Sequence, residues 1–103
     1  MLLVNIEYIP GKEIEALGMV KGTVVQSKNF GKDFMAGMKT LVGGEITGYT
    51  EMLNEARQIA TKRMVDAAGE LGADAVVGLR YASSSVMQGA AEVIAYGTAV
   101  KFC

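Results

Sequence analysis

Few residues of this 103-residue chain are of the types that carry chemistry. It has no histidine, and its one cysteine, Cys103, is the last residue. Histidine is the usual general base near neutral pH and a common metal ligand. Without it, the serine run Ser83–Ser85 lacks the partner that a serine triad needs, and one cysteine forms neither an internal disulfide nor a CxxC metal site. The sequence therefore predicts no catalytic residue, no resident metal and no cofactor.

Five charged residues are candidates for ligand binding because each is flanked by apolar residues or glycine. They are Glu45, Arg57, Asp74, Arg80 and Glu92. We expect charges in such settings to be partly buried, and a partly buried charge needs a partner. That partner is either a ligand or an opposite charge in a structural salt bridge. Both interpretations stay open at this stage.

Three further features have weaker chemical interpretations. Met35 and Met38 are three residues apart, and thioethers suit soft Cu(I), but methionine also fills irregular cores and interfaces. The pair Gly43-Gly44 precedes a helix, where backbone amides can bind an anion or where a turn needs glycine. The terminal thiol of Cys103 has only Lys101 nearby to lower its pKa. Packing is favoured for the two methionines and a turn for the glycine pair.

Composition excludes several classes of partner. Ten basic and eleven acidic residues give a net charge of −1, whereas binding to nucleic acid needs a clustered positive excess. No apolar run approaches the roughly 20 residues of a membrane span, and the N-terminus lacks the basic region of a signal peptide. We therefore expect a cytoplasmic protein that binds neither nucleic acid nor membrane.

The clearest structural element is a long central helix. From Met52 to Leu71, apolar residues recur at intervals of three and four over about six turns. Thr47 or Thr50 can cap its start, and Gly72 stands where a helix often ends in a left-handed residue.

Four segments have the composition of strands: Leu2–Tyr8, Glu15–Ser27, Ala73–Tyr81 and Glu92–Phe102. The spacing within Phe30–Val42 predicts a second, shorter helix. Turn residues are at Ser83–Ser85 and Gln88-Gly89. The order ββααββ predicts one α+β domain over residues 1–103, with a small antiparallel sheet packed against one long and one short helix.

The last strand is apolar on both faces. One face carries Val93, Ala95, Gly97 and Ala99, and the other carries Ile94, Tyr96, Thr98, Val100 and Phe102. A strand of this kind must be covered on both sides, and one helix covers only one. We therefore predict a homo-oligomer whose interface includes Ile94, Tyr96, Val100 and Phe102.

Several segments together resemble one family, in order and nearly end to end. They are Asp33–Met38, Val42–Glu45, Tyr49 with Ala56-Arg57 and Ala60, Leu71–Gly78, and Gly97–Val100. These segments are similar to the YbjQ family of small bacterial proteins, sometimes labelled heavy-metal-binding domains. The resemblance implies a dodecin-like α+β subunit that assembles into a ring-shaped homopentamer, and it implies no established activity.

The heavy-metal label fits these residues poorly. Soft metals prefer thiolate or imidazole ligands, and this chain offers one terminal thiol and no imidazole. Members of the family often carry an acidic residue in the strand after the Val-Val-Gly turn, whereas this chain has the basic Arg80 there.

Three functions remain, of which the first is favoured. The chain is a non-catalytic module that binds a small ligand or ion, or acts as a scaffold, at boundaries between its copies. The alternative is metal-ion binding or trafficking. The second alternative is a carboxylate-based enzyme that also uses a lysine or a tyrosine, for which Tyr49, Tyr81 and Tyr96 are available. Spacing does not pair these tyrosines with any acid.

Overall fold

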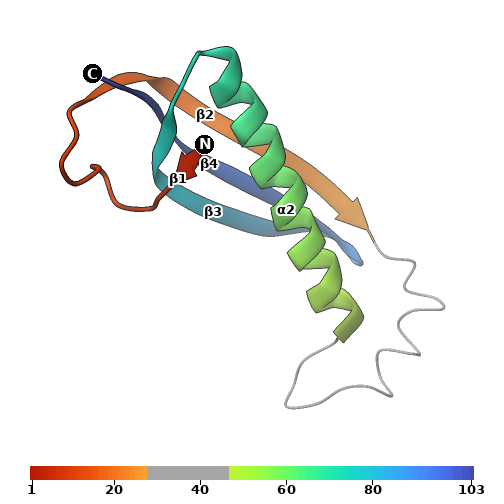
Figure 1. Ribbon diagram of the computed structural model, residues 1–103. Coiled ribbons are helices and arrows are strands. Elements are labelled where there is room, and N and C mark those ends of the chain that lie inside the picture. The colour runs from red at the N-terminus through yellow and green to blue at the C-terminus, as the bar shows by residue number, and fades with distance from the viewer. Residues whose placement is uncertain (28–46) are drawn as a thin grey trace.

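The computed structural model, which describes residues 1–27 and 47–103, is a sheet of four strands with one long helix on one face (Figure 1). The strands are β1 (Leu2–Leu3), β2 (Ile14–Ser27), β3 (Ala75–Met87) and β4 (Ala90–Phe102), and the helix is α2 (Thr47–Glu70). Their order in the sheet is β1-β3-β4-β2. The predicted α+β class is confirmed. The predicted short helix Phe30–Val42, with Met35, Met38, Gly43-Gly44 and Glu45, lies outside the described residues.

Helix α2 forms where the apolar periodicity predicts it. Its buried face consists of Met52, Ala56, Ala60, Met64 and Ala68, which recur at every fourth residue. Thr50 lies inside the first turn, so it is not the cap. The helix ends as predicted at Gly72, which has a φ of 76°, and the amide of Ala73 donates to the carbonyl of Ala68 at 3.1 Å.

Two strand predictions are wrong. Ser83–Ser85 is not a turn, because β3 continues to Met87 and pairs residue by residue with β4. The turn is the next candidate, Gln88-Gly89, where Gly89 has a φ of 80°, a conformation that glycine adopts without steric cost. Cross-strand pairing outweighs the weak turn preference of serine.

The first strand also differs from the prediction. β1 contains two residues instead of Leu2–Tyr8, and it pairs with β3 in parallel. The sheet is therefore mixed rather than wholly antiparallel. Beyond β1 the chain follows β3 without forming a strand, and the amides of Gly78 and Leu79 donate to the carbonyls of Ile6 and Val4 at 2.8 and 3.1 Å.

A β-bulge in β3 determines which way its second half faces. Val77 pairs with Thr98, but the next pair is Arg80 with Tyr96, so β3 contains one extra residue there. Gly78, with a φ of 63°, provides the bend. After the bulge Tyr81 is paired with Ala95, on the helix-facing side, and Arg80 lies on the opposite side.

The two faces of β4 separate as predicted. Val93, Ala95 and Ala99 are buried in the cluster beneath the helix. On the opposite face, a second cluster joins Ile9 with Ala75, Val77 and Val100.

Val100 is only 2% exposed, so the chain's own N-terminal segment covers it and no second copy is needed there. Phe102 packs on the same cluster. The predicted interface differs here because a segment distant in sequence packs on this face. Neither the spacing of apolar residues nor the composition reveals such packing.

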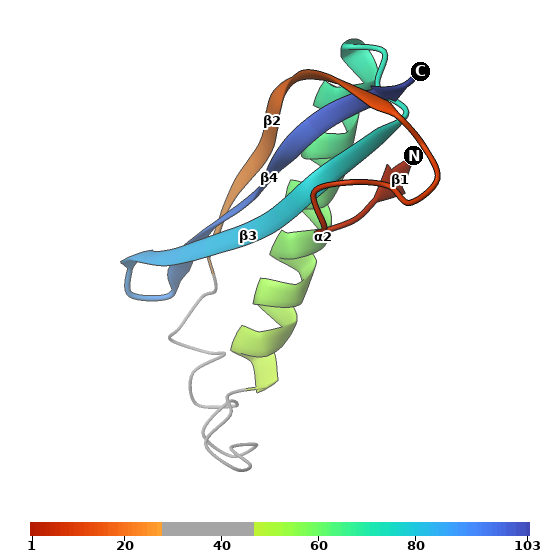
Figure 2. The same ribbon diagram turned by 90° about the vertical axis from the view of Figure 1, so that its left-hand side faces the viewer.

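No segment that the structure describes covers the rest of that face in the same way. Figure 2 shows α2 along one side of the sheet, while the β3–β4 hairpin diverges from the helix. We call the side chains of Met19, Val25, Ile94 and Tyr96 the uncovered half of the sheet, because they lie on the face opposite the helix and the second cluster does not include them.

Substitution of Gly22 tests whether the helix packs as closely on the sheet as described. A methyl group at Gly22 would overlap the backbone of α2 at Ala60 and Met64, so Gly22→Ala must push the helix from the sheet. We expect the free energy of unfolding to fall by about 2–3 kcal/mol, measured by urea denaturation.

The control is Gly69→Ala in α2, where a methyl group has open space. This variant is expected to gain about 0.5–1 kcal/mol from helix propensity. Equal stability of Gly22→Ala and the parent would contradict the described packing.

Candidate functional site

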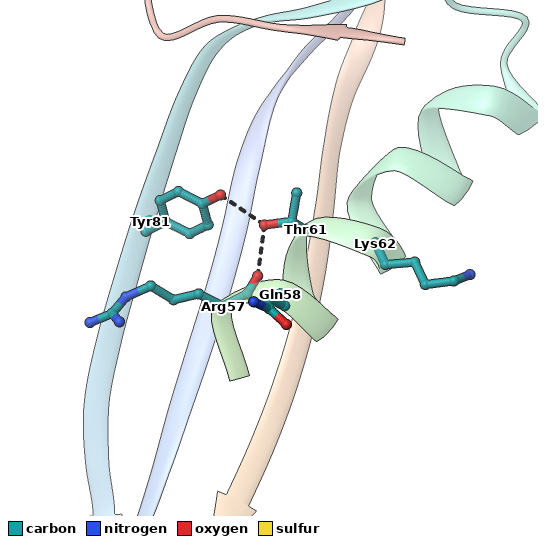
Figure 3. A pocket seen from close by; sticks show the side chains of 5 residues that line it. All are labelled: Arg57, Gln58, Thr61, Lys62 and Tyr81. Carbon is teal, nitrogen blue, oxygen red and sulfur yellow. Dashed lines mark hydrogen bonds between the residues drawn. The ribbon is translucent and has the colours of Figure 1, made fainter. Parts of the chain in front are cut away.

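A surface pocket of about 420 Å³ lies between helix α2 and strand β3. Its lining residues are Arg57, Gln58, Thr61, Lys62 and Tyr81 (Figure 3). Four of them come from two successive turns of α2, and the fifth comes from β3 just after the bulge. The bulge is what brings the pocket together, because without the extra residue Tyr81 would be on the opposite face of the sheet.

The two hydroxyl groups of the pocket form a chain of hydrogen bonds in which the donor of each bond is defined. Thr61 Oγ1 donates to the carbonyl of Arg57 at 2.7 Å, and it also contacts Tyr81 Oη at 2.7 Å. A threonine hydroxyl has one proton, so Tyr81 is the donor in the second bond. This bond fixes the tyrosine ring against the helix.

The two cations of the pocket differ in how they are used. Lys62 Nζ forms an ion pair with Asp66 Oδ2 at 3.0 Å on the exposed surface, and its side chain points away from Tyr81 (Figure 3). Arg57 Nη1 donates to the amide oxygen of Asn54 at 2.7 Å, and its side chain extends alongside Tyr81 (Figure 3). Among the described residues, the side-chain partner of Arg57 is thus neutral, and this contact uses one of its five N–H donors.

The five predicted ligand residues do not meet in one site. Glu45 lies outside the described residues. Asp74 Oδ2 accepts the backbone amide of Phe102 at 2.8 Å. Arg80 Nη1 donates to the carbonyl of Asn5 at 2.7 Å, which joins the bulge to the N-terminal segment. Glu92 is half-buried and opposes Val25 on one side and Ser84 on the other. Only Arg57 lines the pocket.

Gln58, Thr61 and Lys62 were missed as site residues, and Tyr81 was considered only as an enzymatic option. The criterion used on the sequence, a charged residue flanked by apolar residues, finds charges that lie near a core. The residues of this pocket are polar and lie at the surface. One signal in the sequence was available: Gly78 inside a β-rich run is typical of a bulge, and a bulge reverses the face of every residue after it.

The described residues contain no group of three or more His, Cys, Asp or Glu side chains that could hold a metal ion. Cys103 is exposed and free. No helix within the described ranges is long and apolar enough to cross a membrane.

Comparison with known proteins identifies the family. The model of the YbjQ family, described as "Putative heavy-metal-binding", matches residues 1–103. This chain belongs to the YbjQ family. The resemblance inferred from the sequence is therefore confirmed.

Relatives in the YbjQ family match the chain over nearly its full length. A UPF0145 protein of Clostridium novyi (strain NT) is 66% identical over 101 residues, which are 98% of each chain. A second, of Alkaliphilus metalliredigens (strain QYMF), is 63% identical and covers 99% of each chain.

One solved structure has the same fold. It is a crystal structure of a protein with unknown function from the DUF74 family of Pediococcus pentosaceus, which superposes with a TM-score of 0.66 at 17% identity. The match covers 100% of this chain and 98% of that one. At this identity the similarity establishes the fold alone.

The contacts of Asp74 predict a structural role. Asp74→Ala removes the acceptor for the Phe102 amide, so the free energy of unfolding should fall by about 1 kcal/mol. Asp74→Asn keeps an acceptor oxygen and should lose less. Asp66→Ala, which removes only an exposed ion pair, should change it by less than about 0.5 kcal/mol. Urea denaturation measures all three, and a parent-like Asp74→Ala would contradict this role.

Proposed function

We propose that this YbjQ-family chain is a non-catalytic module that binds a ligand or acts as a scaffold, and that it works as a homo-oligomer with its sites at boundaries between copies. The observation that carries the proposal is the uncovered half of the sheet. Met19 is 79% exposed, Val25 58% and Tyr96 37%. Contiguous apolar surface of this kind marks an interaction site.

The shape and charge of this surface favour a second copy as its occupant. Met19, Ile94 and Tyr96 surround a hollow of about 280 Å³. The same face carries Lys21 and Glu92 on neighbouring strands, so two copies can pair opposite charges around an apolar centre. Apolar centres with polar rims are typical of protein interfaces.

The edges of the sheet support an arrangement with more than two copies. β2 is one edge of the sheet. On the other side, β1 covers only Ala75 and Val76 of β3, so within the described residues β3 has no neighbouring strand from Arg80 to Met87. Unpaired edges favour further pairing. Two different edges favour a head-to-tail contact, which gives a ring when the rotation between copies closes on itself. The number five comes from the family resemblance.

The residues of the pocket support binding rather than catalysis. The pocket is lined by a guanidinium, an ammonium, an amide and two hydroxyl groups, all of which can form hydrogen bonds to a ligand. Tyr81 already donates its proton to Thr61. Most of the pocket surface is made of the carbon atoms of these side chains, so a molecule would be held mainly by apolar contact, with Arg57 adding a charge-assisted hydrogen bond.

Assembly is tested by placing a charge on the uncovered half. Met19→Asp should fold, because this side chain is exposed in the single chain, but it would bury an unpaired charge between copies. We expect the native mass of the parent to be a multiple of 10.9 kDa, five for the pentamer, and that of Met19→Asp to fall. Native mass spectrometry measures the mass, and circular dichroism checks folding.

Leu71→Asp is the matched control, because Leu71 is an exposed apolar residue beyond the end of α2 and should leave the mass unchanged. Ile94→Asp should dissociate the assembly, whereas Val100→Asp should prevent folding, since Val100 is buried within the chain. A parent mass of one chain, or an unchanged mass for Met19→Asp, would contradict the proposal.

A further inference from the structure

We propose that the pocket formed by Arg57, Gln58, Thr61, Lys62 and Tyr81 binds a small organic anion that carries a planar ring as well as its anionic group. Arg57 would hold the anionic group, and the ring would lie against Tyr81. The inference rests on the proposed function in one respect, because it makes this pocket one of the sites at a boundary between copies.

The charge of the pocket selects an anion. None of its five lining residues is acidic. Lys62 is already paired with Asp66 and points away from Tyr81 (Figure 3), so Arg57 is the cation that faces a ligand. Within residues 1–27 and 47–103, the side-chain partner of Arg57 is the amide of Asn54 rather than a carboxylate, and that contact does not neutralise its charge. A guanidinium presents paired N–H donors that match the two oxygens of a carboxylate or phosphate.

Tyr81 selects a ligand with a planar portion. Its hydroxyl is bonded to Thr61, which is itself bonded to the helix backbone, so the ring is held in one place. The side chain remains 46% exposed. Planar rings stack on such a surface in an offset or edge-to-face geometry, and a fixed ring loses little entropy when it binds.

The position of the pocket places it beside a neighbouring copy. Tyr81 is on the part of β3 that pairs with β4 on one side and has no strand beside it on the other, among the described residues. In the proposed head-to-tail assembly, the next copy would dock at this edge and cover the open side of the pocket. Removal of water on that side would strengthen the contact between Arg57 and an anion.

Four probes separate the parts of the inference. AMP and benzoate each carry a ring and an anionic group, inorganic phosphate carries only the charge, and benzyl alcohol carries only the ring. Each is titrated into the full chain while the backbone amide signals of Gln58 and Thr61 are followed by NMR. We expect AMP or benzoate to bind at least about tenfold more tightly than phosphate and benzyl alcohol, since each of these lacks one of the two contacts.

Variants identify the residues that are responsible. Arg57→Gln and Tyr81→Ala should each weaken binding of the ring-bearing anion by about tenfold or more. Tyr81→Phe, which keeps the ring, should bind within about threefold of the parent. Lys101→Gln is the charge control, because this exposed lysine on β4 is not part of the pocket, and it should bind as the parent does.

Native mass, recorded on the same samples, distinguishes this inference from the proposed function. Binding that depends on Arg57 supports the inference, and if it occurs in a chain of monomeric mass, the assembly proposal fails while the pocket stands. Three results would overturn the inference: an assembled parent that binds none of the four probes, phosphate binding as tightly as AMP and benzoate, or Arg57→Gln binding as the parent does.

Discussion

The structure depends on one constraint: its central strand is apolar on both faces, and one helix can cover only one of them. β4 lies between β2 and β3 and therefore fills the middle of the sheet. Its residues Val93, Ala95 and Ala99 pack under α2. Gly22 and the alanines of α2 permit this approach, because small residues let the two backbones come close. The opposite face has to find its cover elsewhere.

That second face is divided between two solutions. At one end, the N-terminal segment folds back and places Ile9 against Val100 and Val77. This segment is held by hydrogen bonds at the bulge and by the bond from Arg80 to Asn5. Toward the hairpin, none of the described segments covers Met19 and Tyr96 in a comparable way. In the proposed assembly, other copies cover this remaining surface. The apolar face opposite the helix is thus buried partly by the chain's own N-terminal segment and partly by association with other copies.

Local patterns predicted the elements whose contacts are local. The spacing of apolar residues predicted α2, Gly72 predicted its end, and alternation predicted the two faces of β4. What failed depends on residues far apart in sequence. The pairing of Ser83 with Val93 makes a strand of a segment that resembles a turn. Ile9 packs on Val100, and β1 pairs in parallel with β3. Neither contact produces a periodic pattern of apolar residues in the sequence.

The candidate site illustrates the same limit. Apolar flanks correctly singled out Arg57, but they also selected Asp74 and Arg80, which the fold uses to bind backbone groups. The pocket exists because Gly78 introduces a bulge and turns Tyr81 toward Thr61. A glycine in a strand indicates a bulge. The pairing with the neighbouring strand is needed to show which residue after the bulge faces the helix.

Oxidation of Met19 by dilute hydrogen peroxide measures directly whether other copies cover the uncovered half of the sheet. Met19 is 79% exposed in the single chain and Met1 is 51% exposed, so both would oxidise readily in a monomer. If copies cover this face, peptide mass spectrometry should show Met19 protected while Met1 is oxidised. Oxidation of Met19 as fast as Met1, in the native protein at micromolar concentration, would contradict the account.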